Sequence, residues 1–251
     1  MQVRVWTFWL PKAGNHPDEY EDAFYPLQDG YYTGEHLRFA VADGASEGML
    51  SEVWARLLVK AFVRHGSSAA ETWLERSFRS WASWQRHYLS ARAARKRPLQ
   101  WFEEPGWRAG AFASLVGLTL SPGAWRATAV GDSCLFLVRQ NRVHRAFPLT
   151  SSSQFGGRPG LLSSRSESNR GLDTLDAGGH VQVGDRFYLM TDALACYFLG
   201  AMERGEAPGD ETALLEQDFL RRIQTLRANA LLKNDDVTMV GIEILQECDQ
   251  R

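Results

Sequence analysis

The stretch Phe39-Ala40-Val41-Ala42-Asp43-Gly44 ends a run of apolar residues on an aspartate and a glycine. The apolar run belongs to a predicted β-strand over residues 35–42, so Asp43 lies where the strand meets a loop. A carboxylate at a strand end has a rigid support on one side and an adaptable loop on the other. This position suits a group that must be held in place for binding or catalysis.

Aspartates flank three other predicted strands in the same way: Asp132 follows residues 129–131, Asp192 follows residues 188–191, and Asp235 and Asp236 precede residues 237–240. Any one of them alone is explained by the preference of Asp for turns and strand ends. Several carboxylates brought together would repel one another unless a cation lay between them. Because magnesium and manganese prefer oxygen ligands, the repeated pattern predicts a divalent metal site.

The chain as a whole is typical of an α+β protein, because its predicted strands and helices are segregated more than alternated. Helical periodicity covers residues 48–65, 68–95, 192–204 and 211–229. We expect strands at residues 1–10 (at a sheet edge), 35–42, 186–190 and 237–245, and an antiparallel meander between 110 and 147. Residues 150–180 are rich in Ser and Gly, which predicts a mobile surface loop with little secondary structure.

Composition places the chain among ordinary globular proteins. Its 251 residues suffice for one generous domain or two small ones, and 44% of them are hydrophobic. The net charge of −2 favours neither nucleic acid nor an anionic membrane as a partner. No apolar stretch is long enough to span a bilayer, and residues 1–10 lack the features of a signal peptide. Cys134, Cys196 and Cys248 form no CxxC pair, so we expect a cytoplasmic protein.

Six segments of the chain, in this order, resemble the motifs of the type 2C protein phosphatases, the metal-dependent class of Ser/Thr phosphatases. They are Glu21-Asp22-Ala23-Phe24, Val41-Ala42-Asp43-Gly44, Ala113-Ser114-Leu115-Val116, Val130-Gly131-Asp132-Ser133, Thr191-Asp192 and Asp235-Asp236-Val237-Thr238. The resemblance covers nearly the whole chain and implies a compact, bacterial-type signalling enzyme with one catalytic domain over residues 1–251. The implied fold is a four-layer α-β-β-α sandwich, two antiparallel sheets flanked by helices. Residues 150–180 match the variable flap beside the metals.

The resemblance also implies cofactors and a role for each matching residue. The cofactors are two Mn²⁺ or Mg²⁺ ions, with a site for a third. Asp43 matches the aspartate that bridges the two catalytic metals, and the carbonyl group of Gly44 matches an additional ligand to one of them. Asp22 matches a terminal ligand of the second metal. Glu21 matches a neighbour that acts through metal-bound water.

The remaining aspartates match the ligands of the first metal and of the weaker third site. Asp192 and Asp235 match ligands of the first metal, Asp132 together with Asp192 matches the third site, and Asp236 takes a supporting place. The implied reaction is attack on phosphorus by a metal-activated water, without a phosphoenzyme intermediate. The implied partner is a phosphorylated protein, the product of a cognate Ser/Thr kinase. We expect a monomer that binds neither nucleic acid nor membrane.

The chain differs from the family in the residue that binds the substrate phosphate. The family often places an Arg shortly before the Glu-Asp pair, and residues 15–20 contain none. His16 and Lys12 are candidates to replace it, although His16 is better explained as a plain loop residue. The neighbours of the aspartates also change, in Asp43-Gly44-Ala45-Ser46, Gly131-Asp132-Ser133-Cys134 and Thr191-Asp192-Ala193.

Three functions therefore stay open from the sequence. The first is an active phosphatase for phosphoserine and phosphothreonine. The second is a phosphatase-fold binding or regulatory module with poor turnover, which the missing Arg and the altered neighbours suggest. The third is another two-metal phosphoester hydrolase, although the absence of a basic face argues against a nuclease.

Overall fold

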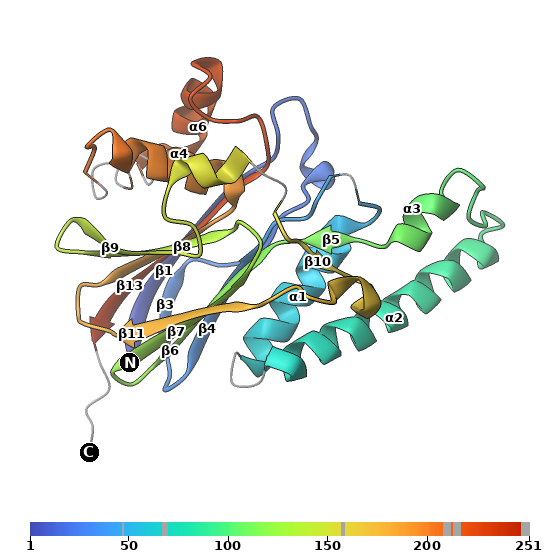
Figure 1. Cartoon of the computed structure of the whole chain (residues 1–251), viewed down its shortest axis with the longest axis horizontal. Helices are drawn as coiled ribbons and strands as arrows, with labels where there is room; N and C mark the ends of the chain where they lie inside the picture. The colour runs from blue at the N-terminus through green and yellow to red at the C-terminus, as the bar shows by residue number, and fades with distance from the viewer. Residues whose placement is uncertain (47, 67–69, 157–158, 208–211, 213–216, 247–251) are drawn as a thin grey trace.

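Two β-sheets lie face to face in the centre of the molecule, with helices on both outer sides (Figure 1). The computed structural model describes residues 1–46, 48–66, 70–156, 159–207, 212 and 217–246. Helices α4 and α6 lie on one side of the paired sheets, and α1 and α2 lie on the other (Figure 1). This confirms the four-layer α-β-β-α arrangement that the family resemblance implies.

The first sheet has six strands, all joined in antiparallel pairs. Its order is β3 (Gly30–Thr33), β1 (Gln2–Leu10), β13 (Val237–Gln246), β12 (Arg186–Met190), β8 (Cys134–Arg139) and β9 (Arg142–Phe147). The strand expected over residues 1–10 is present, but its expected place at the sheet edge is wrong. Strand β3 pairs with residues 2–5 of β1 and takes the edge position instead.

The second sheet has five strands in the order β11 (Leu175–His180), β7 (Ala124–Val130), β6 (Leu115–Ser121), β4 (Leu37–Ala42) and β2 (Ala23–Tyr25). The single meander expected between residues 110 and 147 is wrong, because β7 and β8 belong to different sheets. The chain crosses between the sheets at the turn that carries Asp132. A small two-stranded sheet joins β5 (Phe112–Ala113) to β10 (Leu162–Ser163).

Residues 150–180 hold more secondary structure than their composition predicts. Strand β11 pairs with β7 along six residues, and β10 pairs with β5. Two short 3₁₀ helices, Ser152–Gly156 and Ser166–Asn169, lie between these elements. The expectation of a region with little secondary structure is therefore wrong for this segment, while its role as a flap stays a prediction.

Four of the described helices follow predicted segments with small shifts at their ends, whereas α3 lies where the sequence predicts no helix. They are α1 (Ser51–His65), α2 (Ala70–Ala94), α3 (Glu104–Ala109), α4 (Asp192–Glu203) and α6 (Phe219–Ala228). The helix expected over residues 211–229 is interrupted at Asp218, which caps the start of α6, while Thr212 and Gln217 before it are also helical and residues 211 and 213–216 lie outside the described part. Among the described residues, no helix is long and apolar enough to cross a membrane.

Three hydrophobic clusters fill the spaces between the four layers. The central cluster takes alternate residues from both sheets, such as Phe39 and Val41 of β4 and Val240 of β13. The intervening residues of the same strands point outward: Ala40 packs with α1, and Met239 packs with α4 and α6. Because both faces of the central strands are covered, these strands are apolar along their whole length, and the carboxylates are confined to their ends.

Helix α1 packs on the five-stranded sheet through a glycine. A Cβ atom added to Gly117 of β6 would lie 2.4 Å from the fully buried ring of Phe62. We therefore expect Gly117→Ala to lower the free energy of unfolding by about 1–3 kcal/mol, as overpacking of a core does. Urea denaturation measures this change. Phe62→Leu, which shortens the opposing side chain, should recover part of the loss in the double variant, and additive effects of the two substitutions would contradict the predicted clash.

Candidate metal centre

The predicted carboxylates come together at one edge of the sandwich, where strands of both sheets end. Asp43 follows β4 and Asp132 follows β7 in one sheet, whereas Asp192 follows β12 and Asp235 precedes β13 in the other. Asp22 lies just before β2. The charges of the other four aspartates all act on Asp43, so the five carboxylates form one electrostatic cluster. Sequence segments far apart in the chain thus meet where the metal site is predicted.

Backbone hydrogen bonds fix the loop that carries Asp43 and Gly44. The amide of Ser114 donates to the carbonyl oxygen of Asp43 at 2.9 Å, and Gly44 forms a β-bridge with Ala113. A Cβ atom at Gly44 would lie 2.6 Å from the carbonyl oxygen of Glu21. Only a glycine allows this approach, which brings the Glu21–Asp22 segment against the loop after β4.

Asp22 is buried and held by hydroxyl groups. Thr238 of β13 donates its Oγ1 hydrogen bond to Asp22 Oδ2 at 2.5 Å, and the hydroxyl group of Tyr20 bonds to Thr238 in turn. The other carboxylate oxygen, Oδ1, is buried and has no hydrogen-bond partner among the described residues. A buried carboxylate oxygen without a donor is costly, and a cation is one group that would satisfy it.

Burial and mutual repulsion make the inner carboxylates hard to ionise without a cation. Burial, followed by the charges of Asp22 and Asp192, raises the pKa of Asp43 well above its usual range. Burial also raises the pKa of Asp22, although the hydrogen bond from Thr238 opposes the change. Burial and the charge of Asp192 raise the pKa of Asp132 to about 6. A divalent cation would reverse these shifts by favouring the ionised forms.

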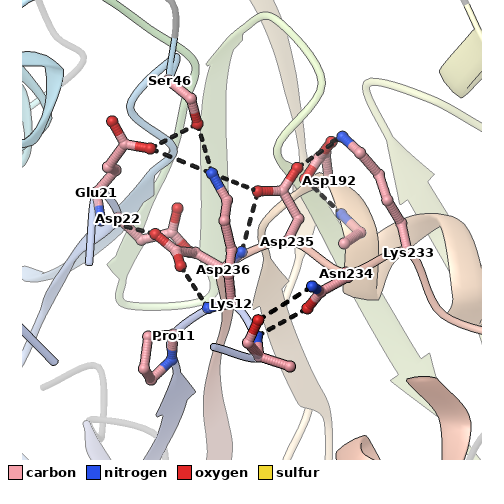
Figure 2. A network of polar contacts seen from close by, with 12 residues as sticks. Pro11, Lys12, Glu21, Asp22, Ser46, Asp192, Lys233, Asn234, Asp235 and Asp236 are labelled. Carbon is pink, nitrogen blue, oxygen red and sulfur yellow. Dashed lines mark hydrogen bonds and ion pairs between the residues drawn. The ribbon is translucent and has the colours of Figure 1, made fainter. Parts of the chain in front are cut away.

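Two lysines supply positive charge at the outer side of the cluster (Figure 2). The ammonium group of Lys12 lies 3.2 Å from Glu21 Oε2 and 3.1 Å from Asp235 Oδ1. Lys233 lies 2.6 Å from Asp235 Oδ2 and 3.6 Å from Asp192 Oδ2. Burial acts against them, but these two lysines lower the pKa of Asp235. Asp235 is thus the carboxylate most clearly kept ionised by the chain's own charges.

Asp236 differs from its neighbour in what it binds. Its carboxylate accepts hydrogen bonds from the backbone amides of Lys12 at 2.8 Å and Glu21 at 2.7 Å. Figure 2 shows these contacts tying the segment after β1 and the segment before β2 to the start of β13. Both oxygens of Asp236 are occupied by backbone donors, which suits the supporting place expected for it.

The donor set fits hard divalent cations in its chemistry. It consists of carboxylate oxygens with a backbone carbonyl nearby, and it includes the unpartnered buried oxygen of Asp22. Within the described part of the chain, no three Asp, Glu, His or Cys side chains already enclose a point at metal-ligand distances. The carboxylates of Asp235 and Asp192 form ion pairs with Lys12 and Lys233, so they are oriented partly toward these lysines. Side-chain rotations at these outer positions would therefore accompany metal binding.

Comparison with protein families identifies the chain. Residues 21–235 match the family model described as protein phosphatase 2C. The chain belongs to the protein phosphatase 2C family. The matched region begins at Glu21 and ends at Asp235, so it contains all five carboxylates of the cluster.

Solved structures share the fold of this protein phosphatase 2C chain. The catalytic domain of serine threonine protein phosphatase PstP, in complex with two manganese ions, is 14% identical with a TM-score of 0.58, covering 98% of this chain and 99% of its own. RsbX in complex with magnesium is 17% identical with a TM-score of 0.54, covering 96% and 95%. Serine/threonine phosphatase Stp1 from Staphylococcus aureus is 14% identical with a TM-score of 0.57, covering 96% and 95%. No curated protein matches the chain.

One predicted site residue lies outside the cluster of this protein phosphatase 2C chain. His16 caps the short 3₁₀ helix η1 (Pro17–Glu19): its side chain accepts from the amide of Asp18, and its ring lies 3.2 Å from the Asp18 carboxylate. The His16 side chain is 72% exposed. His16 therefore lies in an exposed loop, and its phosphate-binding role stays a prediction.

Sequence reasoning missed the residues that support the aspartates. Thr238 and Tyr20 hold Asp22, and Ser46 donates to Glu21 Oε2 at 2.5 Å. The sequence could have predicted a role for Lys233, because a basic residue two positions before Asp235 can form an ion pair with it. It could not have predicted one for Tyr20, since its contact with β13 depends on how the two sheets pack.

Proposed function

We propose that this chain is a metal-dependent phosphoprotein phosphatase that hydrolyses phosphoserine and phosphothreonine. The observation that carries the proposal is the convergence of five aspartates from both sheets on one edge of a protein phosphatase 2C fold: Asp22, Asp43, Asp132, Asp192 and Asp235. Proteins with this fold include serine threonine protein phosphatase PstP, solved with two manganese ions, RsbX, solved with magnesium, and serine/threonine phosphatase Stp1, and they support the same activity and cofactor class.

Each residue of the cluster has a proposed task. Asp43 would contribute its carboxylate to both metals, and the carbonyl of Gly44 and the carboxylate of Asp22 would hold one of them, with Glu21 acting through water. Asp192 and Asp235 would hold the other. Bound Mn²⁺ or Mg²⁺ would supply an activated water and neutralise charge on the phosphoryl oxygens.

A third metal has its own proposed place. Asp132 lies close enough to Asp192 for the charge of Asp192 to raise the Asp132 pKa. The pair therefore offers oxygen ligands beside the main cluster, on the turn between β7 and β8. Occupancy of this place is proposed to be weaker than that of the two main metals, because it has fewer carboxylates.

The test is phosphate release by protein that has been stripped with EDTA and then given Mn²⁺. A phosphothreonine peptide and p-nitrophenyl phosphate should both be hydrolysed with Mn²⁺ and not without it. Metal binding without turnover of either substrate would overturn the proposal. Cleavage of nucleic acid under the same conditions would favour another two-metal hydrolase.

Lys12 is our candidate for the group that grips the substrate phosphate. It is the cationic side chain that enters the cluster from the segment before the Glu21–Asp22 pair, where the family often carries an Arg. We expect Lys12→Met to raise KM for a phosphothreonine peptide roughly 10-fold or more, because a hydrogen bond to a charged group contributes about 1.5–3 kcal/mol. Initial rates at saturating Mn²⁺ measure this effect.

Two matched variants make the Lys12 result specific. Lys12→Arg keeps the charge and should retain most of the affinity for the peptide. Lys96→Met removes an exposed lysine after α2 and should leave KM unchanged. An unchanged KM in Lys12→Met, with Mn²⁺ binding confirmed by calorimetry, would exclude Lys12 from phosphate binding.

A second candidate function is a binding or regulatory module with the phosphatase fold. One observation favours it: Lys12 and Lys233 already neutralise Asp235, which lessens the need for a metal there. Calorimetric titration with Mn²⁺ separates the two candidates. Failure to bind Mn²⁺ at millimolar concentration would favour the module.

The setting of the enzyme is part of the same proposal. We propose a cytoplasmic monomer that reverses the action of a Ser/Thr kinase. Cys134 and Cys196 are free thiols, which suits a reducing compartment, whereas Cys248 lies outside the described residues.

A further inference from the structure

A groove of about 770 Å³ runs beside the carboxylate cluster, between α1 and the segment that leads from β1 into β2. Asp22 and Tyr20 contribute to its wall. Tyr20 bonds to Thr238, and Thr238 donates to Asp22, so the groove and the cluster share one hydrogen-bonded wall. A polypeptide whose phosphorylated residue reaches the cluster can therefore continue into this groove.

One side of the groove carries a stripe of positive charge. Arg56, Lys60 and Arg64 follow one another at four-residue intervals along α1, so they lie on one face of the helix, and all three are exposed. Arg56 lies 3.9 Å from Glu52 on the same helix. In the described part of the chain, neither Lys60 nor Arg64 lies within 4.0 Å of a carboxylate, so their charges are available to a ligand.

The opposite side of the groove is mostly apolar and partly exposed, and Asp18 is an exposed carboxylate beside it. Leu27 is 73% exposed, Trp9 is 43% exposed and Tyr25 is 39% exposed. The ring of Trp9 packs on Tyr20 with 4.9 Å between ring centroids. Because Tyr20 is tied to β13 through Thr238, this apolar wall is held in place before any ligand arrives.

We propose that the groove binds the part of the phosphoprotein substrate that flanks the phosphorylated residue, and that it selects flanks with acidic residues and a bulky apolar side chain. The occupant follows from charge complementarity with Lys60 and Arg64 and from the continuity of the groove with the cluster. An apolar side chain would cover Leu27 and Trp9, and carboxylates would pair with the helix stripe. The inference rests on the proposed phosphatase function and specifies its substrate class.

The test compares two phosphothreonine peptides of equal length. One carries Glu, Leu and Phe on both sides of the phosphothreonine, and the other carries Lys and Gly. Wild-type protein should favour the acidic–apolar peptide about 10-fold in kcat/KM, and the preference should shrink at high salt. The double variant Lys60→Glu/Arg64→Glu should lose this preference and retain wild-type turnover of p-nitrophenyl phosphate, which is too small to reach the groove.

A matched double variant controls for net charge. Lys96→Glu/Arg97→Glu makes the same charge change at exposed residues after α2 and should keep the peptide preference. The proposal is overturned if wild-type protein treats the two peptides alike. It is also overturned if the groove variant keeps the preference, or loses p-nitrophenyl phosphate turnover in the same proportion as peptide turnover.

Direct binding separates the groove from the catalytic proposal. If no substrate is hydrolysed, the proposed function fails, and fluorescence anisotropy with a labelled, unphosphorylated acidic–apolar peptide then decides on the groove alone. Binding that weakens about 10-fold in Lys60→Glu/Arg64→Glu supports the groove. Absent binding, or equal binding by the variant, overturns it.

Discussion

Asp43→Asn should lower kcat/KM for a phosphothreonine peptide by about 1,000-fold or more. The proposed bridging role makes Asp43 the one side chain shared by both metals, and metal-based charge stabilisation contributes several kcal/mol, at about 1.4 kcal/mol per tenfold in rate. The substitution replaces one carboxylate oxygen by an amide nitrogen of the same size. The loss of activity should therefore come from the lost charge. The fold decrease in kcat/KM should be the same with p-nitrophenyl phosphate.

Measurements of metal binding and stability show whether the loss of activity in Asp43→Asn comes from lost metal binding or from unfolding. Calorimetry should show that Asp43→Asn weakens Mn²⁺ binding strongly, while circular dichroism shows an intact fold. Without metal, the variant should be at least as stable as wild type, because burial and neighbouring aspartates already disfavour the charge of Asp43. Asp173→Asn, at an exposed aspartate, should change nothing. Full activity in Asp43→Asn would exclude the proposed bridging role.

The acidic strand ends were predictable because they depend on local pattern. Each of Asp43, Asp192 and Asp235 adjoins an apolar strand, and buried strands admit charged residues only where they end. The order of strands and turns then brought the aspartates to a common edge. Sequence resemblance supplied the proposed roles, which no local pattern contains.

The short strands were missed because pairing, not composition, creates them. Ala23–Tyr25 and Gly30–Thr33 have too few residues to show alternation, and they become strands by pairing with β4 and β1. Leu175–His180 contains two glycines and is mostly exposed, yet its backbone pairs with β7. Such segments become strands because they pair with an existing sheet, so their own strand propensity does not identify them.

The charges around the cluster depend on contacts between distant segments. Lys12 ends near Asp235 because the Asp236 carboxylate binds the Lys12 amide, and Asn234 binds the backbone of Ala13. These contacts join opposite ends of the chain. The sequence offers both Lys12 and His16 as candidates for a phosphate ligand. Only the tertiary fold shows that Lys12 lies against Glu21 and Asp235 while His16 is exposed in a loop.

Metal-free protein should lose stability as the pH rises from about 5 to 8, which is the reverse of the usual behaviour of ion-paired carboxylates. The pKa values of Asp22, Asp43 and Asp132 are raised in the folded state, and that of Asp132 reaches about 6 from an ordinary value of 3.8. A raised pKa means that the folded state holds its proton more tightly than the unfolded state. The resulting stability is fully present below the ordinary carboxyl pKa and is lost as the pH rises through the folded pKa.

Asp235 changes the pH dependence of stability in the opposite direction, but its effect falls at lower pH. Burial opposes the change, yet Lys233 and Lys12 lower its pKa, so its contribution is lost only as the pH falls below the ordinary carboxyl range. Burial also raises the pKa of Asp236. Between pH 5 and 8 the four carboxyl groups with raised pKa values therefore determine the direction of the stability change, against the opposite contribution of His65, whose pKa is lowered. Scanning calorimetry in EDTA should show a lower Tm at pH 8 than at pH 5.

Divalent metal should reverse this loss, because it takes the place of the protons on the buried carboxylates. At about 100 times its Kd, Mn²⁺ stabilises a folded protein by about 2.7 kcal/mol if it does not bind the unfolded chain. At one fixed Mn²⁺ concentration the rise in Tm should be larger at pH 8 than at pH 5, because fewer protons compete there. Asp43→Asn should flatten both the pH dependence and the metal response while leaving the rest of the surface charge in place. A metal response of equal size at both pH values would mean that the raised carboxylates are not the groups that bind the metal.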